Sequence, residues 1–361
     1  MNLTQKLALI KFIKLKNSID RKILAGLCIA ILCLLSASAN AQIVETFGTG
    51  ANQFSLNFVP IVNPGNANDT TGYGGVSYSY NMGVYDVSQT QLANAVASSG
   101  YNLGGGTWSG NQPATNLNWY QAAAFVNYLN TSQGYVAAYN LTFTGNTPTG
   151  INLQTGANVW TLGGNDYLRN ANAKYFLPSE NEFYKAAYYS PGGVYYNYAT
   201  GSNSVPTAVT SGTAPGTAVY SDGTSVFPTQ PADINQAGGL SPYGTMGQSG
   251  NVYQYNETDF FDPSNGSFQS PVVRGGFWNQ ASSFLSSSTR YTVDPTYTFD
   301  RIGLRVASFD GAVMTATPEP SSWLLGLIAL GLLVYLRRRG IRAQASSINQ
   351  SPTAQAETGY F

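Results

Sequence analysis

Three residue blocks in the middle of the chain constrain its fold more than any other feature. They are residues 175–183 (YFLPSENEF), 249–255 (SGNVYQY) and 274–279 (RGGFWN). In the first block, Ser179 follows a proline and precedes Glu182 by three residues, which is the spacing of a helix capping box. Elsewhere, short runs rich in Tyr, Val and Thr are divided by Gly, Asn and Pro, which predicts short strands in a loop-rich domain.

Two further helices are predicted from capping residues that precede an apolar periodicity. Ser88 and Gln91 have capping-box spacing, so a helix is expected to begin after Ser88. Asn118 can cap a second helix, whose apolar residues recur at helical spacing. These residues are Ala122, Phe125, Val126 and Leu129. Residues 80–86 alternate in character and predict a strand, whereas residues 200–240 lack periodicity and predict a long surface insertion.

Taken in order, these pieces resemble the formylglycine-generating enzyme family, also called the sulfatase-modifying-factor domain. Six blocks carry the resemblance: residues 83–88, 117–122, 176–183, 250–255, 274–278 and 303–305. The resemblance implies an α+β fold, a variant of the C-type lectin fold that is loop-rich with few helices and short strands. We therefore expect this domain at residues 78–312, preceded by a lead-in at residues 42–77.

The side-chain inventory restricts the chemistry of such a domain. The chain has no histidine, and its two cysteines, Cys28 and Cys33, precede the domain. Hydrolysis by a Ser-His-Asp triad and ordinary zinc sites are therefore excluded. The resemblance implies two copper-binding cysteines shortly after the RGGFWN block, at positions held here by Gln280 and Leu285. Copper(I) needs thiolate ligands, so neither copper nor formylglycine-generating activity is expected.

Carboxylate chemistry is the enzymatic alternative that this inventory leaves open. Glu180 with Glu182, and Asp259 with Asp262, are the two closely spaced carboxylate pairs. Such pairs run acid and base steps when they are held at a suitable separation. The first pair falls in the first turn of a capped helix, where acidic side chains stabilise the helix N-terminus, so we expect a structural role there. The second pair falls in a predicted turn.

The resemblance also implies a structural calcium site around the second block. The family's glutamate is Gln254 here, and Gly247 stands where the family commonly has Asp or Asn. Calcium prefers charged oxygens, so both changes weaken the site. The remaining candidates are Gly250, Asn251, Val252 and Gln254. Asn251, like Arg274 and Arg305, is alternatively expected to satisfy buried backbone groups.

Charge and aromatic content indicate the class of partner. Charged residues make up 9% of the chain, and residues 42–317 hold seven basic and fourteen acidic residues, a net charge of −7. A nucleic-acid partner is excluded because it requires a basic surface. A neutral polysaccharide fits better, because aromatic faces stack on sugars and amides orient them. We expect exposed tyrosines to carry this binding: Tyr188, Tyr189, Tyr195 and Tyr196.

The N-terminus has the layout of a secretory signal peptide. Six Lys or Arg residues precede an apolar run at residues 23–35, and Ala39-Asn-Ala41 matches a small-residue cleavage site. Residues 1–41 are therefore predicted to be removed by signal peptidase. The alternative is a retained anchor, although the apolar run is short for a bilayer span.

The C-terminal region resembles the PEP-CTERM sorting signal of Gram-negative and related bacteria. Its triplet is Pro318, Glu319 and Pro320, its transmembrane segment is residues 323–336, and its basic cluster is Arg337, Arg338 and Arg339. The resemblance implies a signal at residues 313–340, transient membrane insertion, cleavage by an exosortase, and delivery to the cell surface or an extracellular matrix. The polar tail at residues 341–361 departs from the pattern. The alternative is a plain C-terminal anchor with its basic side in the cytoplasm.

Together these features predict an exported surface or matrix protein with a non-catalytic domain that binds exopolysaccharide. No cofactor is expected apart from the weakened calcium site. Two other functions stay open: a sulfatase-modifying-factor-type oxidoreductase or other enzyme that uses a site outside the family pattern, and a structural component of the envelope.

Overall fold

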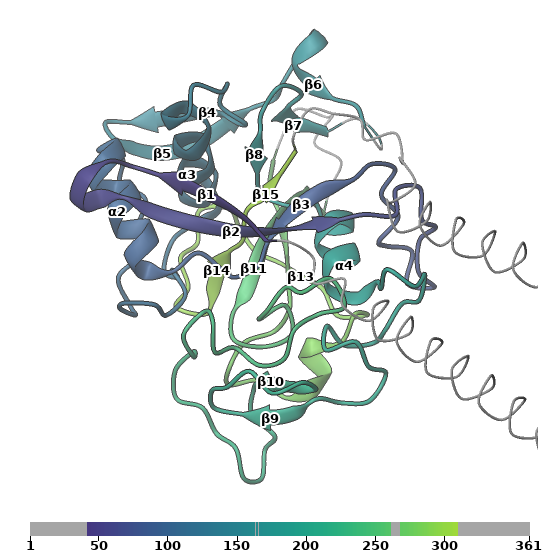
Figure 1. Ribbon diagram of the computed structural model, residues 1–361. Helices are drawn as coiled ribbons and strands as arrows, with labels where there is room; N and C mark the ends of the chain where they lie inside the picture. Colours follow the sequence, from purple (N-terminus) through teal and green to yellow (C-terminus); the bar gives the residue numbers. More distant parts are fainter. Residues whose placement is uncertain (1–41, 163, 165, 261–267, 310–361) are drawn as a thin grey trace, which may run out of the picture. The chain divides into compact units, whose positions relative to one another are not determined.

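The computed structural model describes residues 42–162, 164, 166–260 and 268–309, which fold into the domain drawn in Figure 1. The described residues form three α-helices, two larger sheets and three two-stranded ribbons joined by long loops. This arrangement confirms the predicted α+β class, with its few helices and short strands.

The strands group into sheets as follows. The first sheet has the order β1-β2-β3-β15-β8 and is antiparallel throughout: β1 (Ile43–Phe47), β2 (Phe54–Ile61), β3 (Tyr80–Gly83), β15 (Ala307–Ser308) and β8 (Tyr175–Phe176). The second has the order β13-β12-β11-β14, with β11 and β14 parallel: β13 (Tyr291–Thr292), β12 (Pro271–Arg274), β11 (Tyr253–Asp259) and β14 (Ile302–Leu304). The ribbons are β4 (Asn140–Thr144) with β5 (Thr147–Asn152), β6 (Val159–Trp160) with β7 (Asp166–Asn170), and β9 (Thr207–Val209) with β10 (Thr217–Val219).

The α-helices begin where the capping residues predict. They are α2 (Gln89–Ser99), α3 (Trp119–Ser132) and α4 (Glu180–Tyr188), and each has a complete capping box. The N-caps are Ser88, Asn118 and Ser179, so local spacing alone places all three helix starts. The remaining helices are single 3-10 turns: η1 (Gly50–Asn52), η2 (Gly156–Asn158) and η4 (Ser282–Leu285).

Helix α3 is buried on every side from Trp119 to Asn130, not only along its predicted apolar stripe. It contacts β4, β5 and β8 as well as α2. Polar side chains on this helix therefore satisfy backbone groups of its neighbours: Asn130 donates to the carbonyl of Tyr175 at 2.7 Å and Asn127 to that of Tyr139 at 2.7 Å. Helix α3 thus forms the centre of the core.

The segment predicted as a lead-in belongs to the first sheet. Strands β1 and β2 form its edge, and Phe47 and Phe58 are fully buried in the main core. Strand β2 pairs with β3, so residues from about 43 onward extend the sheet of the domain that is expected at residues 78–312. The sequence blocks lie further along the chain, so none of them predicted this pairing.

The insertion, residues 200–240, is not confined to the surface as expected. Ala218, Val219 and Tyr220 are buried, and Val219 accepts a hydrogen bond from the backbone N–H of Asn251 at 2.9 Å. The Asn251 side chain in turn accepts from the N–H of Ala232 at 2.9 Å. The insertion is held by long-range backbone contacts, which have no periodic sequence signal. In Figure 1 its ribbon, β9 with β10, lies at the bottom of the domain.

Both chain ends lie outside the described residues. The predicted signal peptide (1–41), sorting signal (313–340), membrane segment (323–336) and polar tail (341–361) fall there. Among the residues that the structure describes, no helix is both long enough and apolar enough to cross a bilayer.

Candidate functional site

The two positions that the resemblance assigns to copper-binding cysteines lie close to the insertion. Leu285, in η4, is fully buried and packs against Ala218 and Tyr220 in a small apolar cluster. A Cβ atom on Gly276 would come within 3.0 Å of the Leu285 side chain, so little free space surrounds it. Leu285 is therefore a core residue beneath the insertion.

Gln280 lies beside the same part of the insertion. Its backbone carbonyl accepts a hydrogen bond from the N–H of Ser221 at 3.0 Å. Its side-chain Oε1 and the hydroxyl of the adjacent Tyr253 are buried, and within the described part of the chain neither makes a hydrogen bond of normal geometry. Burial raises the pKa of Tyr253 to about 12, although the adjacent Gln280 side chain lowers it. No thiol or imidazole exists in the described residues, so this position holds an amide and a neutral phenol.

Exposed aromatic rings follow the RGGFWN block. The rings of Phe284 and Tyr291 stack with their centroids 5.9 Å apart and their planes inclined by 21°. Tyr297 and Phe299 form a second, edge-to-face pair at 6.1 Å. Tyr291 is 43% exposed, and Tyr297 and Phe299 are also exposed. We call Tyr291, Tyr297 and Phe299 the aromatic surface.

The tyrosines predicted to bind a polysaccharide are less accessible than expected. Tyr188 is fully buried in its α4 turn and Tyr189 is buried, while Tyr195 and Tyr196 are half-buried. The ring of Tyr195 lies 4.6 Å from that of Tyr189, and its hydroxyl donates to the carbonyl of Ala67 at 2.9 Å. The prediction that Tyr188 and Tyr189 are exposed was wrong, because Tyr188 packs into a buried cluster from α4 and Tyr189 is covered where its backbone pairs with that of Tyr195.

The predicted calcium ligands are engaged within the protein. The Gln254 amide donates to the Gly247 carbonyl at 2.7 Å and accepts from Arg305 Nε at 2.8 Å. The Asn251 side-chain oxygen accepts from a backbone N–H, so only the backbone carbonyls of Gly250 and Val252 remain as candidates. A guanidinium beside Gln254 repels a cation. The described residues contain no group of three or more His, Cys, Asp or Glu side chains that could hold a metal, so the calcium site stays a prediction that rests on backbone carbonyls.

Arg305 also contacts a buried aspartate. Its Nη2 lies 3.2 Å from Asp86 Oδ1, and its Nη1 donates to the Gly83 carbonyl at 2.7 Å. Burial raises the pKa of Asp86 to about 7, despite the lowering effect of Arg305 and Asn251. Arg305 thus satisfies buried backbone and side-chain acceptors, as the sequence analysis expected.

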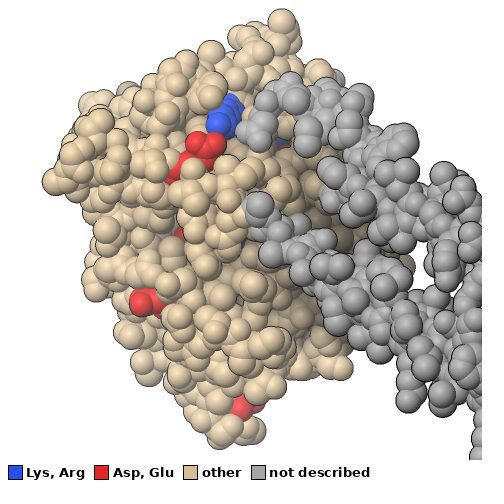
Figure 2. Space-filling model, viewed as in Figure 1, with Lys and Arg blue, Asp and Glu red and all other residues tan. Residues whose placement is uncertain are grey.

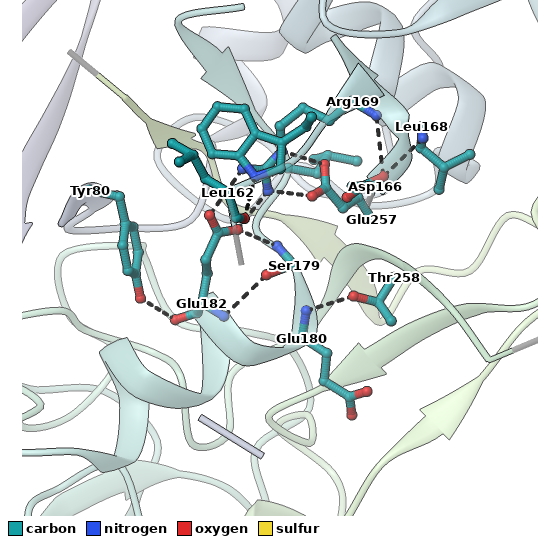
Figure 3. A network of polar contacts seen from close by, with 12 residues as sticks. Tyr80, Leu162, Asp166, Leu168, Arg169, Ser179, Glu180, Glu182, Glu257 and Thr258 are labelled. Atoms are coloured by element: carbon teal, nitrogen blue, oxygen red, sulfur yellow. Dashed lines mark hydrogen bonds and ion pairs between the residues drawn. The ribbon is translucent and has the colours of Figure 1, made fainter. Parts of the chain in front are cut away.

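A buried network joins Arg169 of β7 to two glutamates from distant parts of the chain (Figure 3). Arg169 contacts Glu182 through two hydrogen bonds, at 3.0 and 2.6 Å, and its Nε donates to Glu257 Oε2 at 3.1 Å. A second contact joins Arg169 Nη2 to Glu257 Oε1. Its guanidinium also lies 3.5 Å from the centre of the Phe176 ring. All three charged side chains are almost completely buried.

Although both glutamates contact Arg169, their pKa values shift in opposite directions. Burial alone would raise the pKa of Glu182, but the Arg169 guanidinium outweighs it and holds that pKa below its usual range. For Glu257, burial raises the pKa well above its usual range, Arg169 offsets only part of the rise, and the neighbouring Asp166 adds to it. Arg169 thus favours the ionised form of Glu182, whereas burial favours the protonated form of Glu257.

The predicted carboxylate pairs are structural. Glu182 caps α4, and Glu180 accepts from Arg274 Nε at 2.7 Å and from Arg290 Nη2 at 2.7 Å. Arg274 also donates to the carbonyls of Ser287 and Thr289. Asp259 accepts from two backbone N–H groups, at 2.9 Å each, and Asp262 lies outside the described residues. None of the described carboxylates in these pairs is free to act as an acid or base.

Comparison with known proteins assigns the chain to a family. Residues 74–309 match the profile of the sulfatase-modifying factor enzyme 1-like domain. The chain belongs to this family. Residues 316–339 match the PEP-CTERM protein-sorting motif, so an exosortase recognises the chain during export to the cell envelope or surface. Both findings confirm the resemblances drawn from the sequence.

The chain is similar to several solved structures at low sequence identity. Treponema denticola variable protein 1 is 21% identical, with a TM-score of 0.50 over 74% of this chain and 99% of that chain. CarF is 17% identical, with a TM-score of 0.46 over 74% and 98%. PvdO from Pseudomonas aeruginosa is 14% identical, with a TM-score of 0.40 over 73% and 97%. The comparison with curated protein sequences gives no match.

Several buried contacts described above were not predicted from the sequence. Neither the contact of Leu285 with the insertion nor the partnership of Arg169 with Glu257 was predicted. Arg169 and Glu257 are 88 positions apart, so no local spacing connects them. The sequence contains one weak indication that Arg169 is buried: this arginine follows the apolar Leu168 in a chain with few cations.

Many charged side chains of the family domain are buried. The buried charged residues are Asp86, Arg169, Glu180, Glu182, Lys185, Glu257, Asp259, Arg274 and Arg305. Within the described ranges, Asp233, Asp294 and Arg301 are exposed, the side chain of Asp300 is 41% exposed, and six further charged residues are partly exposed: Glu45, Asp69, Asp166, Lys174, Asp222 and Arg290. Figure 2 shows one face of the molecule, on which few charged side chains interrupt a neutral surface. The exterior therefore consists mainly of amides, hydroxyls and apolar groups.

Proposed function

We propose that this protein is a cell-surface or matrix protein whose family domain binds a neutral exopolysaccharide and does not generate formylglycine. Membership of the family and the sorting motif support the general setting. The observation that carries the loss of catalysis is the packing of Leu285 under the insertion, with Gln280 at the other cysteine position. Without thiolates these positions have no copper(I) ligands.

The neutral exterior and its exposed rings support the choice of ligand. A charged polymer is recognised through exposed ions, and few of these are present among the described residues. Aromatic rings offer apolar faces to sugar rings, while amides and hydroxyls fix orientation without desolvating an ion. The aromatic surface and Phe227, which is 56% exposed, are the rings available for this role. The chain passes through the inner membrane before release at the surface.

The catalytic part of the proposal is tested by incubating the mature domain with a sulfatase-type peptide that contains the target cysteine. We expect no formylglycine by mass spectrometry, with or without copper, because the positions of the ligands hold Gln280 and Leu285. A copper-loaded family enzyme that retains both cysteines is the positive control. Copper-dependent conversion by this chain would favour the oxidoreductase alternative.

The binding part is tested by affinity electrophoresis in gels that contain the neutral exopolysaccharide of the producing cells. We expect weak retardation that is the same at low and high salt, because few exposed ions contribute. Gels without polysaccharide provide the baseline mobility. Unchanged mobility would favour a structural envelope component, and retardation abolished by salt would show an ionic mode that this surface does not predict.

A further inference from the structure

A cleft of about 660 Å³ lies between two loops, residues 109–112 and the part of the insertion at residues 227–233. Its volume is within the range of about 300–1,000 Å³ that is typical of small-molecule sites. The residues that matter for its chemistry are Ser109, Asn111, Gln112, Phe227, Gln230 and Asp233. No Lys or Arg lines the cleft.

The two walls of the cleft are tied together at their bases. The Gln112 side chain donates to the carbonyl of Pro231 at 3.0 Å, and the N–H of Ile234 donates to the carbonyl of Asn111 at 2.9 Å. The Asn111 side chain also donates to Asn235 at 3.0 Å. Because these bonds cross from one wall to the other, the cleft is formed before any ligand binds. A preformed site loses less conformational entropy on binding than a flexible loop does.

The lining of the cleft has the composition of a neutral-sugar site. Phe227 presents an exposed ring, and Thr229 and Gln230 are exposed beside it. The one carboxylate, Asp233, is exposed and can accept from sugar hydroxyls. The absence of a cation from the lining disfavours phosphate and sulfate groups.

We propose that this cleft is the sugar-binding subsite of the protein, with Phe227 as the stacking ring and Gln230 as the residue that orients hydroxyl groups. The inference rests on the proposed polysaccharide-binding function and specifies where it resides. The insertion then has two roles: one side covers Leu285, and the other forms a wall of the cleft.

The test measures retardation of the mature wild-type chain and of Phe227→Ala in gels with the neutral exopolysaccharide. Loss of one stacking ring is expected to weaken binding by about threefold or more. Phe227→Trp keeps a ring and should retain the wild-type affinity. Phe143→Ala, which removes a ring 39% exposed on β4, is the matched control and should bind as the wild type does. Equal unfolding midpoints for wild type and Phe227→Ala will show that the fold is intact.

The outcomes separate the inference from the function on which it rests. If the wild type is retarded and Phe227→Ala is retarded equally, the cleft is not the subsite, although the protein still binds polysaccharide. Weakening by Tyr291→Ala alone would move the site to the aromatic surface. If the wild type itself is not retarded, the proposed function fails and the assignment of the cleft fails with it.

Discussion

At the scale of single residues, the buried charges determine how the fold responds to pH. Arg169 provides one positive charge to Glu182 and Glu257, so an interior that solvates charge poorly favours the protonated form of one of the two acids. The bidentate contact and the α4 cap select Glu182 as the ionised acid. The hydroxyl of Tyr139 lies 2.9 Å from Glu257 and joins the network.

Replacing Glu257 with Gln is expected to flatten the dependence of stability on pH. The folded-state pKa of Glu257 is raised, so the folded protein holds this proton more tightly than the unfolded chain does. Its contribution is complete below the unfolded pKa, about 4.3, and is lost as the pH rises toward the folded pKa. Urea unfolding at pH 5 and pH 8 should show a smaller loss in Glu257→Gln than in wild type, by about 1.4 kcal/mol for each unit of pKa shift removed.

The matched control for that measurement is Glu45→Gln. Glu45 pairs with Lys174 at 2.9 Å in a partly exposed site, so the same substitution there should cost at most about 1 kcal/mol. If Glu257→Gln keeps the full wild-type slope, Glu257 is ionised in the folded protein and the division of charge described above is wrong.

At the scale of elements, the sequence predicted the features that depend on contacts between nearby residues and missed those that depend on residues far apart in the chain. The three helix starts were predicted because Ser88, Asn118 and Ser179 cap through residues three positions away. The fold class was predicted because six sequence blocks occur in the same order as in the family. The burial of the insertion could not be predicted, because its contacts join its backbone to residues 251 and 280 and leave no periodic pattern. The cleft is closed by other long-range contacts, which join Asn111 and Gln112 to residues 231–235, so it also had no sequence signal.

A substitution at Gly250 tests how closely the insertion packs against the rest of the domain. This residue has a φ of +89°, and a Cβ atom there would lie 2.3 Å from the carbonyl oxygen of Val219. Gly250→Ala should therefore destabilise the fold both by left-handed strain and by displacing β10. Gly216→Ala is the control, since it has a φ of +74° with no atom within 4 Å. We expect about 1–2 kcal/mol for the control by urea unfolding and a clearly larger loss at Gly250.

Equal losses for the two glycine substitutions would show that the insertion moves away from the second sheet without cost. That result would also weaken the view that the insertion covers Leu285. A large loss at Gly250 with an unchanged transition slope would show that the insertion unfolds together with the rest of the domain.

At the scale of the whole molecule, processing at both ends sets the form that acts at the cell surface. The Ala39-Asn-Ala41 site and the Pro318-Glu319-Pro320 triplet predict a mature chain that begins near Gln42 and ends near residue 320. Intact-mass measurement of protein recovered from native cells will give both ends. A mass that includes residues 323–339 would support the plain C-terminal anchor, and one that includes residues 1–41 would support an N-terminal anchor.

The inward placement of charge has a further consequence for a protein that accumulates at high density. Residues 42–317 carry a net charge of −7 spread thinly over a largely neutral exterior, so repulsion between two molecules is weak once ordinary salt screens it. Their spacing is then governed by shape and by the water bound to amides and hydroxyls. A layer of this protein would therefore change its density less between fresh and salt water than a layer of highly charged proteins would.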